Sequence, residues 1–468
     1  MREGEQIDRG VLAEREFEGA RLGDARRSRR LVRVASAVAS RCSDSLPDIM
    51  GSNAALEATY RFLGKEEVSA EAILKPHQEN TRQRCSQEDR VLAVFDTSEL
   101  RFGGDREQLG HLQHGGRGML AHVGLAVSAD GRRDPLGVLH LETVLRSAEK
   151  KGRNSAAGAA DNERLRWHRG VEAVFKSVPS AICVMDREAD VFDLAYEMSA
   201  RQQSFIVRAA QNRATTEGPL WDLLDDMEQV STRVVEIAAR AKHPRKSKRD
   251  LYPERSAHAA TLELRVRAVV VRQPRAILAT KKRPARSLTL NLVHVIERDP
   301  PEGEAPIQWM LLTNLAVSTP EEVGFVVDSY CTRWVIEEFF KALKSGCAIE
   351  KRQLESVKAI TNMLAISLPI AWLLLRIRNL SRDEPDRPAT SMLSPLMLKC
   401  LRVLSLKHRR YVLPDEPTCK ELAWAIAGLG GHIQNNGEPG FMVLGRGLDK
   451  LLMAAEVAAD MGWRCDQS

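Results

Sequence analysis

The chain has 468 residues, of which 43% are hydrophobic and 28% are charged, and this composition is typical of a globular protein with two to four domains. Its 69 Lys and Arg residues against 63 Asp and Glu residues give a formal net charge of +6, which permits a nucleic-acid partner without requiring one. The eight cysteines are scattered without a CxxC pair, which excludes the usual zinc-site spacing and favours reduced thiols in a cytosolic protein.

The first 70 residues or so are predicted to be helical and rich in arginine. The opening sequence MREGEQIDRGVLAERE has no apolar core, so no signal peptide is expected there. In ARLGDARRSRRLVRVASAVASR, the apolar residues Leu31, Val34, Ala35 and Val38 give the predicted helix a side to bury. The arginines gathered in this helix are Arg26, Arg27, Arg29, Arg30 and Arg33.

From about residue 90 the apolar pattern alternates between strands and helices, which indicates a mixed α/β domain. The predicted strands are RVLAVFD (90–96), MLAHVGLAVSAD, GVLHLETVL, AICVMD (181–186), SFIVRA (204–209) and IQWMLLTN (307–314), and the predicted helices are 161–176 and 189–202. Residues of about 228–300 interrupt the alternation with three β-rich stretches and a basic loop, so we interpret them as a β-insertion.

The last third of the chain is predicted to be helical. Thr319, Pro320 and Glu322 have the spacing of a capping box, and the helix that they begin is expected to continue through Lys344. The apolar run at 363–375 is too short to span a bilayer, so a buried helix is expected there. A polar linker at 381–391 precedes the predicted C-terminal helices.

Five residues of the helix after Thr319 follow one another at steps of 3, 4, 4 and 3 residues. At 100° per residue, their side chains fall within about 80° of one another on the helix. A carboxylate among cations on one helical face suits a site that holds a metal ion beside phosphates. The five residues are Tyr330, Arg333, Glu337, Lys341 and Lys344.

Three carboxylates stand out by position: Asp96 and Asp186 each end a predicted strand, and Glu337 lies on the late helix. Two aspartates and a glutamate can hold two divalent cations about 4 Å apart, and oxygen ligands favour Mg²⁺ or Mn²⁺ over zinc. The alternative is structural, because an Asp after a strand is commonly a turn residue or a helix cap. Neighbouring carboxylates compete for the role, namely Glu99, Glu188, Asp190 and Glu338, of which Asp190 is expected to cap the helix from 191.

These segments resemble the DDE-type cut-and-paste transposases of the Tn-five class, in the insertion-sequence-four group. The likeness rests on FDTSEL, MDREADVF and YCTRWVIEEFFKALKSG, and it extends to LGDARRSRRLVRVA, YRFLGKEEVSAEAI, QWMLLT and LAWAIAGLGGHI. It implies an RNase H-like catalytic core at 73–380 with the β-insertion at about 228–300. It also implies a helical domain at 1–72 that binds transposon ends and a helical C-terminal domain at 381–468 that dimerises.

The resemblance also implies residue roles. Asp96, Asp186 and Glu337 would be the catalytic residues and hold Mg²⁺, with Mn²⁺ able to substitute. Trp309 would stack on a flipped base, with ordinary core packing as the alternative. The implied DNA contacts are Tyr330, Arg333, Lys344, Arg208, Arg30 and Arg61, to which the residue pattern adds Lys341, Arg26, Arg27 and the basic-loop residues Lys246 and Lys248. A solvated face is the alternative for the N-terminal arginines.

The function expected from this resemblance is DNA transposition. A homodimer would bind double-stranded transposon ends, cleave them through a hairpin intermediate and join the 3′-OH ends to target DNA. The protein is expected to be cytoplasmic and associated with the nucleoid, without a membrane partner. Two alternatives stay open: a metal-dependent nuclease or resolvase without integration, and a catalytically silent DNA-binding regulator.

Overall fold

The structure is a computed structural model that describes residues 15–104, 106–113, 115–146, 163–240, 254–274, 286–408 and 411–463. The chain divides into two compact units. Unit 1 combines residues 1–178 with 334–468, and unit 2 comprises residues 179–333. These boundaries differ from the predicted divisions after residues 72 and 380, because the helices at both ends of the chain pack within unit 1.

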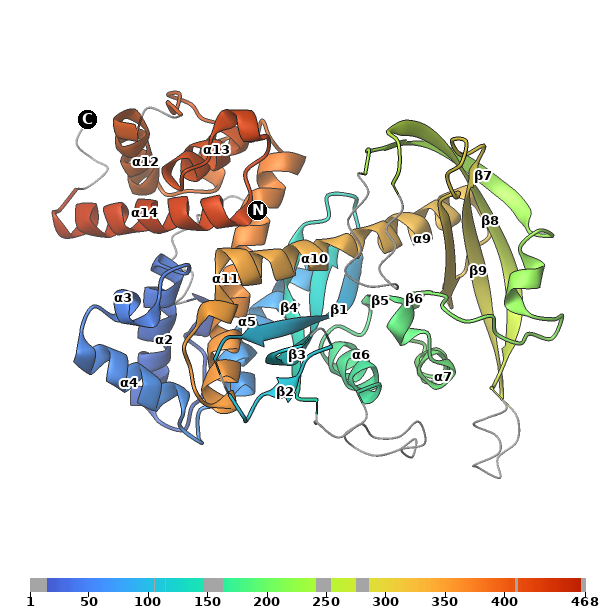
Figure 1. Ribbon diagram of the computed structural model, residues 1–468, viewed down its shortest axis with the longest axis horizontal. Helices are drawn as coiled ribbons and strands as arrows, with labels where there is room; N and C mark the ends of the chain where they lie inside the picture. The colour runs from blue at the N-terminus through green and yellow to red at the C-terminus, as the bar shows by residue number, and fades with distance from the viewer. Residues whose placement is uncertain are drawn as a thin grey trace. The chain divides into compact units, whose positions relative to one another are not determined.

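Between Asp24 and Ser86, within the described residues, unit 1 has four helices (Figure 1). They are α2 (Ala25–Ser40), α3 (Leu46–Met50), α4 (Asn53–Leu63) and α5 (Ala70–Cys85). Each begins after a residue whose side chain accepts a hydrogen bond from a backbone amide of the first turn. These caps are Asp24, Ser45, Ser52 and Ser69, and they satisfy donors that a helix leaves unpaired at its start.

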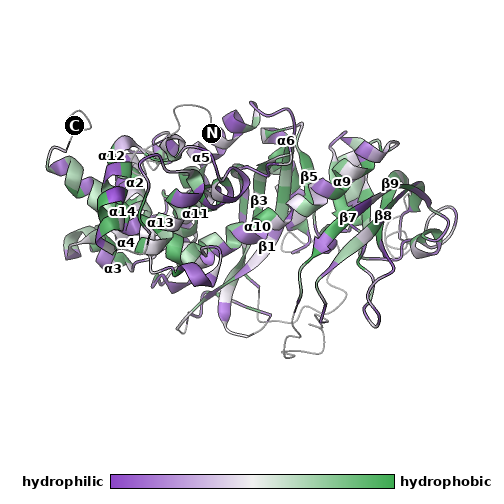
Figure 2. Ribbon diagram, turned by 90° about the horizontal axis from the view of Figure 1, so that it is seen from above, coloured by the Kyte–Doolittle hydropathy of each residue, from purple (hydrophilic) through white to green (hydrophobic). Residues whose placement is uncertain are grey.

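The strands of unit 1 are β1 (Val91–Phe102), β2 (Gly110–His111), β3 (Arg117–Ser128) and β4 (Pro135–Val144). Strand β3 pairs antiparallel with each of the other three. It is buried along nearly its whole length, and Figure 2 shows it as strongly hydrophobic. Gly124 on β3 leaves room for the ring of Phe95, since a Cβ there would lie 2.7 Å from a ring carbon.

Helices pack against these strands. Helix α6 (Leu165–Ser177) contacts β3 and β4, α10 (Trp334–Lys341) contacts β1, and the long helix α11 (Val357–Asp383) contacts β4 and α5. Helix α11 is long and apolar enough to cross a membrane, but 89% of its most apolar window is buried inside the structure. The expectation of a buried helix around Pro369 is therefore confirmed.

The C-terminal helices are α12 (Pro395–His408), α13 (Cys419–Leu429) and α14 (Phe441–Asp460), with short 3₁₀ turns at Ala389–Ser391 and Gln434–Asn436. Helices α13 and α14 approach very closely, and a Cβ at Gly447 would lie 1.6 Å from the carbonyl oxygen of Ile426. Helices α13 and α14 also contact α11, so the polar segment at 381–391 does not detach the tail from unit 1.

In unit 2 the strand order is β5-β6-β10-β9-β8-β7. Strands β5 and β6 are parallel, and each other neighbouring pair is antiparallel. The three strands expected between residues 228 and 300 are present. The strands are β5 (Ile182–Met185), β6 (Phe205–Arg208), β7 (Glu228–Ile237), β8 (His258–Arg272), β9 (Ser287–Arg298) and β10 (Gln308–Thr313).

The helices of unit 2 are α7 (Phe192–Ala200) and α9 (Pro320–Thr332), with 3₁₀ turns η1 (Arg187–Ala189) and η2 (Leu220–Leu223). The predicted capping box at Thr319 and Glu322 is confirmed. The prediction of one uninterrupted helix through Lys344 is wrong. The helical pattern is broken at Arg333, α10 ends at Lys341, and Ala342–Gly346 form a π-helical turn, η3. The 100° spacing that put five side chains on one stripe therefore holds only within each piece.

A buried ionic cluster joins the N-terminal segment to the rest of unit 1. The Glu16 carboxylate contacts His77 Nδ1 and accepts a hydrogen bond from Arg84 Nη1 at 2.9 Å. His77 Nε2 accepts from the Val138 amide of β4 at 3.0 Å, and Arg84 lies over the ring of Trp372 in α11 at 4.3 Å. Burial opposes the charge on Glu16, but His77 and Arg84 outweigh it and lower the pKa of Glu16 to about 2.

We expect Glu16→Gln to lower the free energy of unfolding by about 3 kcal/mol, because the half-buried Arg84 would lose its counter-charge. Since the pKa of Glu16 falls from 4.5 to about 2 on folding, this contribution is complete above pH 4.5 and is lost as the pH falls toward 2. Urea unfolding of both proteins between pH 3 and 8, in steps of about one unit, measures the gap. Glu18→Gln, at an exposed neighbour, is the control and should change nothing.

Candidate active site

Asp96 lies within strand β1 and is half-buried. The five residues before it, from Val91 to Phe95, are all buried, and Leu100 and Phe102 beyond it are buried again. The prediction that the strand ends at Asp96 is therefore wrong, since β1 continues to Phe102. Its Oδ1 atom accepts a hydrogen bond from the amide of Thr97 at 2.7 Å. Because side chains alternate along a strand, Asp96 and Thr97 face opposite sides of the sheet.

Glu337 lies in the first turn of α10, a helix of unit 1 that contacts β1. The helix buries Val335, Ile336, Phe339 and Phe340, and Glu337 is half-buried beside them. The structure therefore places Asp96 and Glu337 on two elements of one unit that touch each other. The two residues are 241 positions apart in the sequence, so this contact between β1 and α10 could not be predicted from local pattern.

The two lysines after Glu337 occupy different kinds of backbone. Lys341 ends α10 and is exposed, whereas Lys344 is half-buried in the π-helical turn. Arg352 holds the segment after this turn to the N-terminal part of unit 1. Its guanidinium donates to the carbonyl oxygens of Cys42 at 2.5 Å and of Cys347 at 3.2 Å. Arg352 thus ties the segment that follows the Lys344 turn both to Cys42 in the N-terminal part of unit 1 and to Cys347 at the end of the turn.

Asp186 follows strand β5 directly and is half-buried in unit 2. Its Oδ1 accepts from the amide of Glu188 at 2.9 Å, so it caps η1. Capping fixes the direction of the carboxylate, as the Thr97 amide does for Asp96. The alternative prediction, that an aspartate after a strand caps a turn, is thus confirmed for Asp186, and capping does not exclude a role as a metal ligand.

Asp190 does not cap the helix that follows it, and that prediction is wrong. The N-cap of α7 is Val191, which makes no side-chain capping bond. Asp190 is instead buried, and it accepts from the Ala210 amide at 2.7 Å and pairs with Arg213 at 2.6 Å. Its partners lie 20 or more residues away, which is why the local sequence gave no sign of them.

The other carboxylates that competed with the predicted triad also have structural partners. Glu338 pairs with Arg378 at 3.3 Å and with Arg382 at 3.1 Å. Glu99 accepts from Arg146 at 2.8 Å and from a backbone amide. Glu188 is exposed in the η1 turn. Glu338 and Glu99 are thus engaged in ion pairs within unit 1.

Unit 2 also gathers three of the predicted DNA-contacting residues. The rings of Trp309 on β10 and Tyr330 on α9 lie edge to face with centroids 5.5 Å apart. The Arg208 guanidinium at the end of β6 is 5.9 Å from the Trp309 ring. Tyr330 is buried, whereas Trp309 is half-exposed. Trp309 is thus not a fully buried core residue, and its stacking role stays a prediction.

Several cations crowd this cluster. Burial chiefly lowers the pKa of Arg208, and the nearby Arg187 and Arg333 lower it further, whereas Tyr330 acts in the opposite direction. A site where positive charges raise one another's energy is suited to an anion. Arg187 was not singled out from the sequence, although its place directly after Asp186 is a signal that could have identified it.

The N-terminal arginines lie on α2 and α4. Arg26 and Arg61 are exposed and Arg30 is half-buried. Arg27 is engaged within the protein, since it pairs with Glu67 at 2.8 Å and donates to the carbonyl oxygen of Leu22 at 3.0 Å. Lys246 and Lys248, the predicted contacts of the basic loop, lie outside the described residues.

The predicted metal ligands fit a hard divalent cation by donor type, because all three offer carboxylate oxygens. Asp96 and Glu337 belong to unit 1, and Asp186 belongs to unit 2. Within the part of the chain that the structure describes, no three His, Cys, Asp or Glu side chains are grouped closely enough to hold a metal. The assembly of the triad therefore stays a prediction.

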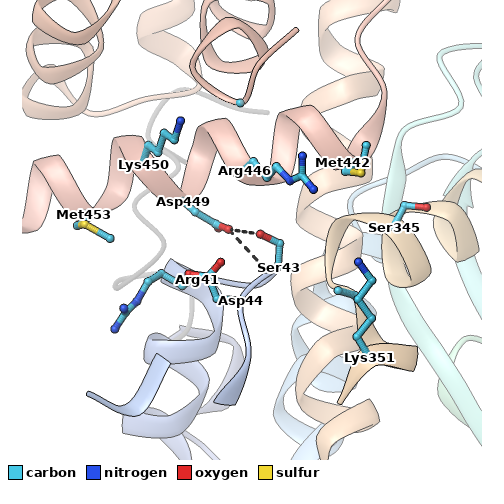
Figure 3. A pocket seen from close by; sticks show the side chains of 12 residues that line it. Arg41, Ser43, Asp44, Ser345, Lys351, Met442, Arg446, Asp449, Lys450 and Met453 are labelled. Carbon is cyan, nitrogen blue, oxygen red and sulfur yellow. Dashed lines mark hydrogen bonds between the residues drawn. The ribbon is translucent and has the colours of Figure 1, made fainter. Parts of the chain in front are cut away.

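A separate pocket of about 430 Å³ lies where the N-terminal segment meets α14 in unit 1 (Figure 3). Neither Asp96 nor Glu337 lines it. Asp449 of α14 is buried there and accepts from the Ser43 hydroxyl at 3.0 Å and from the Cys42 amide at 3.2 Å. The pocket's basic side chains are Arg41, Lys351, Arg446 and Lys450.

Two family models match the chain. The model described as "Transposase DNA-binding" matches residues 11–68, and the model described as "Transposase DDE domain" matches residues 144–374. Among solved structures, the cryo-EM structure of a piggyBac transposase synaptic complex with hairpin DNA is similar at 10% identity and a TM-score of 0.34. That match covers 80% of this chain and 66% of the other, and a score this low adds nothing to the assignment.

We expect Asp190→Ala and Asp186→Ala to separate structure from function within one five-residue segment. The first substitution leaves Arg213 buried without its counter-charge, so the free energy of unfolding should fall by about 3–5 kcal/mol. The second removes a half-buried cap of a three-residue turn and should cost about 1 kcal/mol or less. Thermal unfolding of both variants and the parent measures the difference. Equal losses would contradict this distinction.

Proposed function

We infer that this chain, which matches a transposase DNA-binding model at residues 11–68 and a transposase DDE-domain model at residues 144–374, cuts DNA at transposon ends and joins the ends to target DNA. The observation that supports this is the set of half-buried carboxylates on core elements. Asp186 and Glu337 fall inside the matched DDE domain, and Asp96 lies on a strand that contacts the helix of Glu337. We propose that these three residues are the catalytic triad.

Mg²⁺ is the proposed cofactor, with Mn²⁺ able to replace it, and the three carboxylates would hold it. When bound, such ions make the attacking oxygen more nucleophilic and stabilise the charge on the leaving oxygen. The chain's own contribution is orientation. The Thr97 and Glu188 amides fix the carboxylates of Asp96 and Asp186 before any ligand arrives, so little reorganisation is required on binding.

The proposed reaction has four phosphoryl transfers. Water attacks the phosphodiester at the transposon end and releases a 3′-OH. That hydroxyl attacks the opposite strand, which closes a hairpin on the transposon end and frees the flanking DNA. A second water reopens the hairpin, and the regenerated 3′-OH attacks a phosphodiester of target DNA. Each step exchanges one P–O bond for another, so no oxidant or covalent protein intermediate is needed.

The cationic groups would hold the DNA backbone during these steps. We propose that Tyr330, Arg333 and Lys344 contact phosphates near the reacting end, with Lys341 beside them. A hairpin forces its terminal bases apart, and the half-exposed ring of Trp309 next to Arg208 can stack on an extruded base. This arrangement would lower the free energy of the strained hairpin relative to an open end.

End recognition is assigned to the N-terminal helices. The matched DNA-binding region contains Arg26, Arg27, Arg30 and Arg61. Exposed arginines gain affinity for DNA by displacing counterions from phosphates, and this gain falls with added salt. Arg26 and Arg61 are the best placed for such contacts, because Arg27 already pairs with Glu67.

Three further assignments belong to the same proposal. They are an RNase H-like core, membership of the Tn-five class and a cytoplasmic location.

We also propose that the protein works as a homodimer on paired ends. Helix α14 exposes Met442, Met453 and Val457, and Met461 follows at its end. At 100° per residue these four lie within about 100° of one another, on a face that also carries the exposed residues Arg446, Lys450 and Asp460. The neighbouring helix α12 exposes Val403 and Leu406. A second copy of the chain is the proposed partner for this face.

The catalytic assignment predicts that Asp186→Asn abolishes Mg²⁺-dependent cleavage of a labelled transposon-end duplex. The amide keeps the size of the side chain but loses the negative charge that holds the cation. Binding of the uncut end, followed by gel shift, should change less than threefold or so. Glu188→Gln, at an exposed neighbour, is the matched control and should cleave like the parent.

The outcomes separate the candidate functions. Cleavage by the parent followed by joining of precut ends to target DNA supports transposition. Cleavage without joining points to a nuclease, and binding without cleavage points to a DNA-binding regulator. Full cleavage by Asp186→Asn would overturn the triad.

The dimer proposal predicts that Met453→Asp together with Val457→Asp weakens self-association by tenfold or more, because two charges would be buried in an apolar contact. Sedimentation velocity with an end duplex measures the change. Lys450→Asp would be a poor control, because Lys450 lies on the same side of the helix as the four residues and donates to the Leu429 carbonyl oxygen. Glu456→Asp, at an exposed position of α14, keeps the charge and is the better one. Unchanged association of the double variant would refute the proposal.

A further inference from the structure

Thr97, the residue after Asp96, is tied to the neighbouring strand by its side chain. Thr97 on β1 and His122 on β3 are directly opposite each other in the antiparallel ladder. The Thr97 hydroxyl lies 2.9 Å from His122 Nδ1. His122 is fully buried, and its ring packs edge to face against Trp167 at 4.7 Å and stacks on Phe95 at 5.7 Å. The histidine therefore has little freedom to turn.

Helix α6 contributes the second contact to the same hydroxyl. Arg166 Nε donates to Thr97 Oγ1 at 3.1 Å, and Arg166 Nη1 donates to the carbonyl oxygen of Glu163 at 2.7 Å. Arg166 is itself buried, with 5% of its surface exposed. Gly170 allows α6 to approach, since a Cβ there would lie 2.9 Å from Phe95 and 3.1 Å from His122 Nε2.

The donors and acceptors of Arg166, Thr97 and His122 limit how these residues can hydrogen-bond to one another. A guanidinium only donates, so the Thr97 oxygen accepts from Arg166. The Thr97 hydroxyl shares a second hydrogen bond with His122 Nδ1, which accepts when the neutral ring carries its proton on Nε2 and donates when it carries it on Nδ1. Burial, with help from His140, Arg166 and Arg169, lowers the pKa of His122 well below its usual range, in agreement with a neutral ring.

The backbone amide of Thr97 connects these side-chain contacts to the Asp96 carboxylate. The amide of Thr97 donates to Asp96 Oδ1 at 2.7 Å. Once the Thr97 side chain is fixed on one face of the sheet, the direction of its amide is fixed as well, and the Asp96 carboxylate on the opposite face is oriented by that amide. The chain of contacts runs from Arg166 and His122 through Thr97 to Asp96.

We propose that Thr97, His122 and Arg166 are positioning residues that orient the carboxylate of Asp96 for divalent-cation binding. This inference rests on the proposed function, in which Asp96 is a metal ligand. None of the three touches substrate in this account, and each acts through the next residue. Groups that orient a metal ligand in this way commonly change metal affinity or activity by about 10–100-fold when they are removed.

The test replaces the hydroxyl and keeps the shape. Thr97→Val removes the oxygen and leaves Arg166 Nε and His122 Nδ1 without their partner, whereas Thr97→Ser retains the oxygen. With the full-length chain, Mn²⁺ binding is followed by electron paramagnetic resonance, and end cleavage is measured as a function of Mn²⁺ concentration. We expect the valine variant to bind Mn²⁺ about 10–100-fold more weakly, and the serine variant to bind within about threefold of the parent.

A stability control separates orientation from general damage. Val174→Ala removes buried methyl groups from α6 and should lower the melting temperature without changing Mn²⁺ affinity. If Thr97→Val does not fold, Arg166→Gln takes its place in the same comparison. If Thr97→Val, or Arg166→Gln in its place, loses stability but binds Mn²⁺ like the parent, the inference is overturned, because a purely structural network would behave in this way.

Asp96→Asn distinguishes this inference from the function on which it rests. If that variant still binds Mn²⁺ and cleaves like the parent, Asp96 is not a ligand, and both the proposed triad and the positioning network fall. If Asp96→Asn loses both properties while Thr97→Val keeps them, only the positioning network is wrong. Loss in Asp96→Asn and Thr97→Val, with recovery in Thr97→Ser, supports both.

Discussion

The register between β1 and β3 is the constraint on which the candidate site depends. A strand shows its side chains alternately to two faces, so a slip by one residue would exchange Asp96 with Thr97 and bury a carboxylate against α6. The paired positions of Thr97 and His122, and the space that Gly124 leaves for Phe95, hold this register. The apolar interior of unit 1 thus determines which face of the sheet carries negative charge.

The sequence predicted the elements of the fold better than their contacts. The strands around Asp96, Asp186 and Trp309 were evident from short apolar runs, and the capping box at Thr319 from three residues alone. Such features depend on neighbours in the chain. The break at Arg333 and the π-helical turn at Lys344 were missed, because both interrupt a pattern that favours one helix throughout.

At the candidate site, the remaining differences between the predictions from the sequence and the structure arise from contacts between residues that are distant in the chain. The sequence predicts Asp190 as a helix cap, but in the structure Asp190 binds Arg213 and the backbone amides of residues 210 and 211. In the same way, Thr97 has no local signal that connects it to His122 or Arg166. Asp186 and Asp190, which lie four residues apart, show the contrast. The position of the half-buried Asp186 at the end of its strand was evident from the local sequence, whereas the contacts of the buried Asp190 are set by tertiary packing.

The hydrogen bonds of Asp449 to Cys42 and Ser43 join parts of the chain that are 407 residues apart. At a synthesis rate of about 5–20 residues per second, roughly 20–80 s separate the emergence of these partners from the ribosome. For about the first 310 residues of that interval the turn after α2 lacks the Arg352 guanidinium as well. Its hydrogen bonds are therefore completed only when the last stretch of the chain is synthesised.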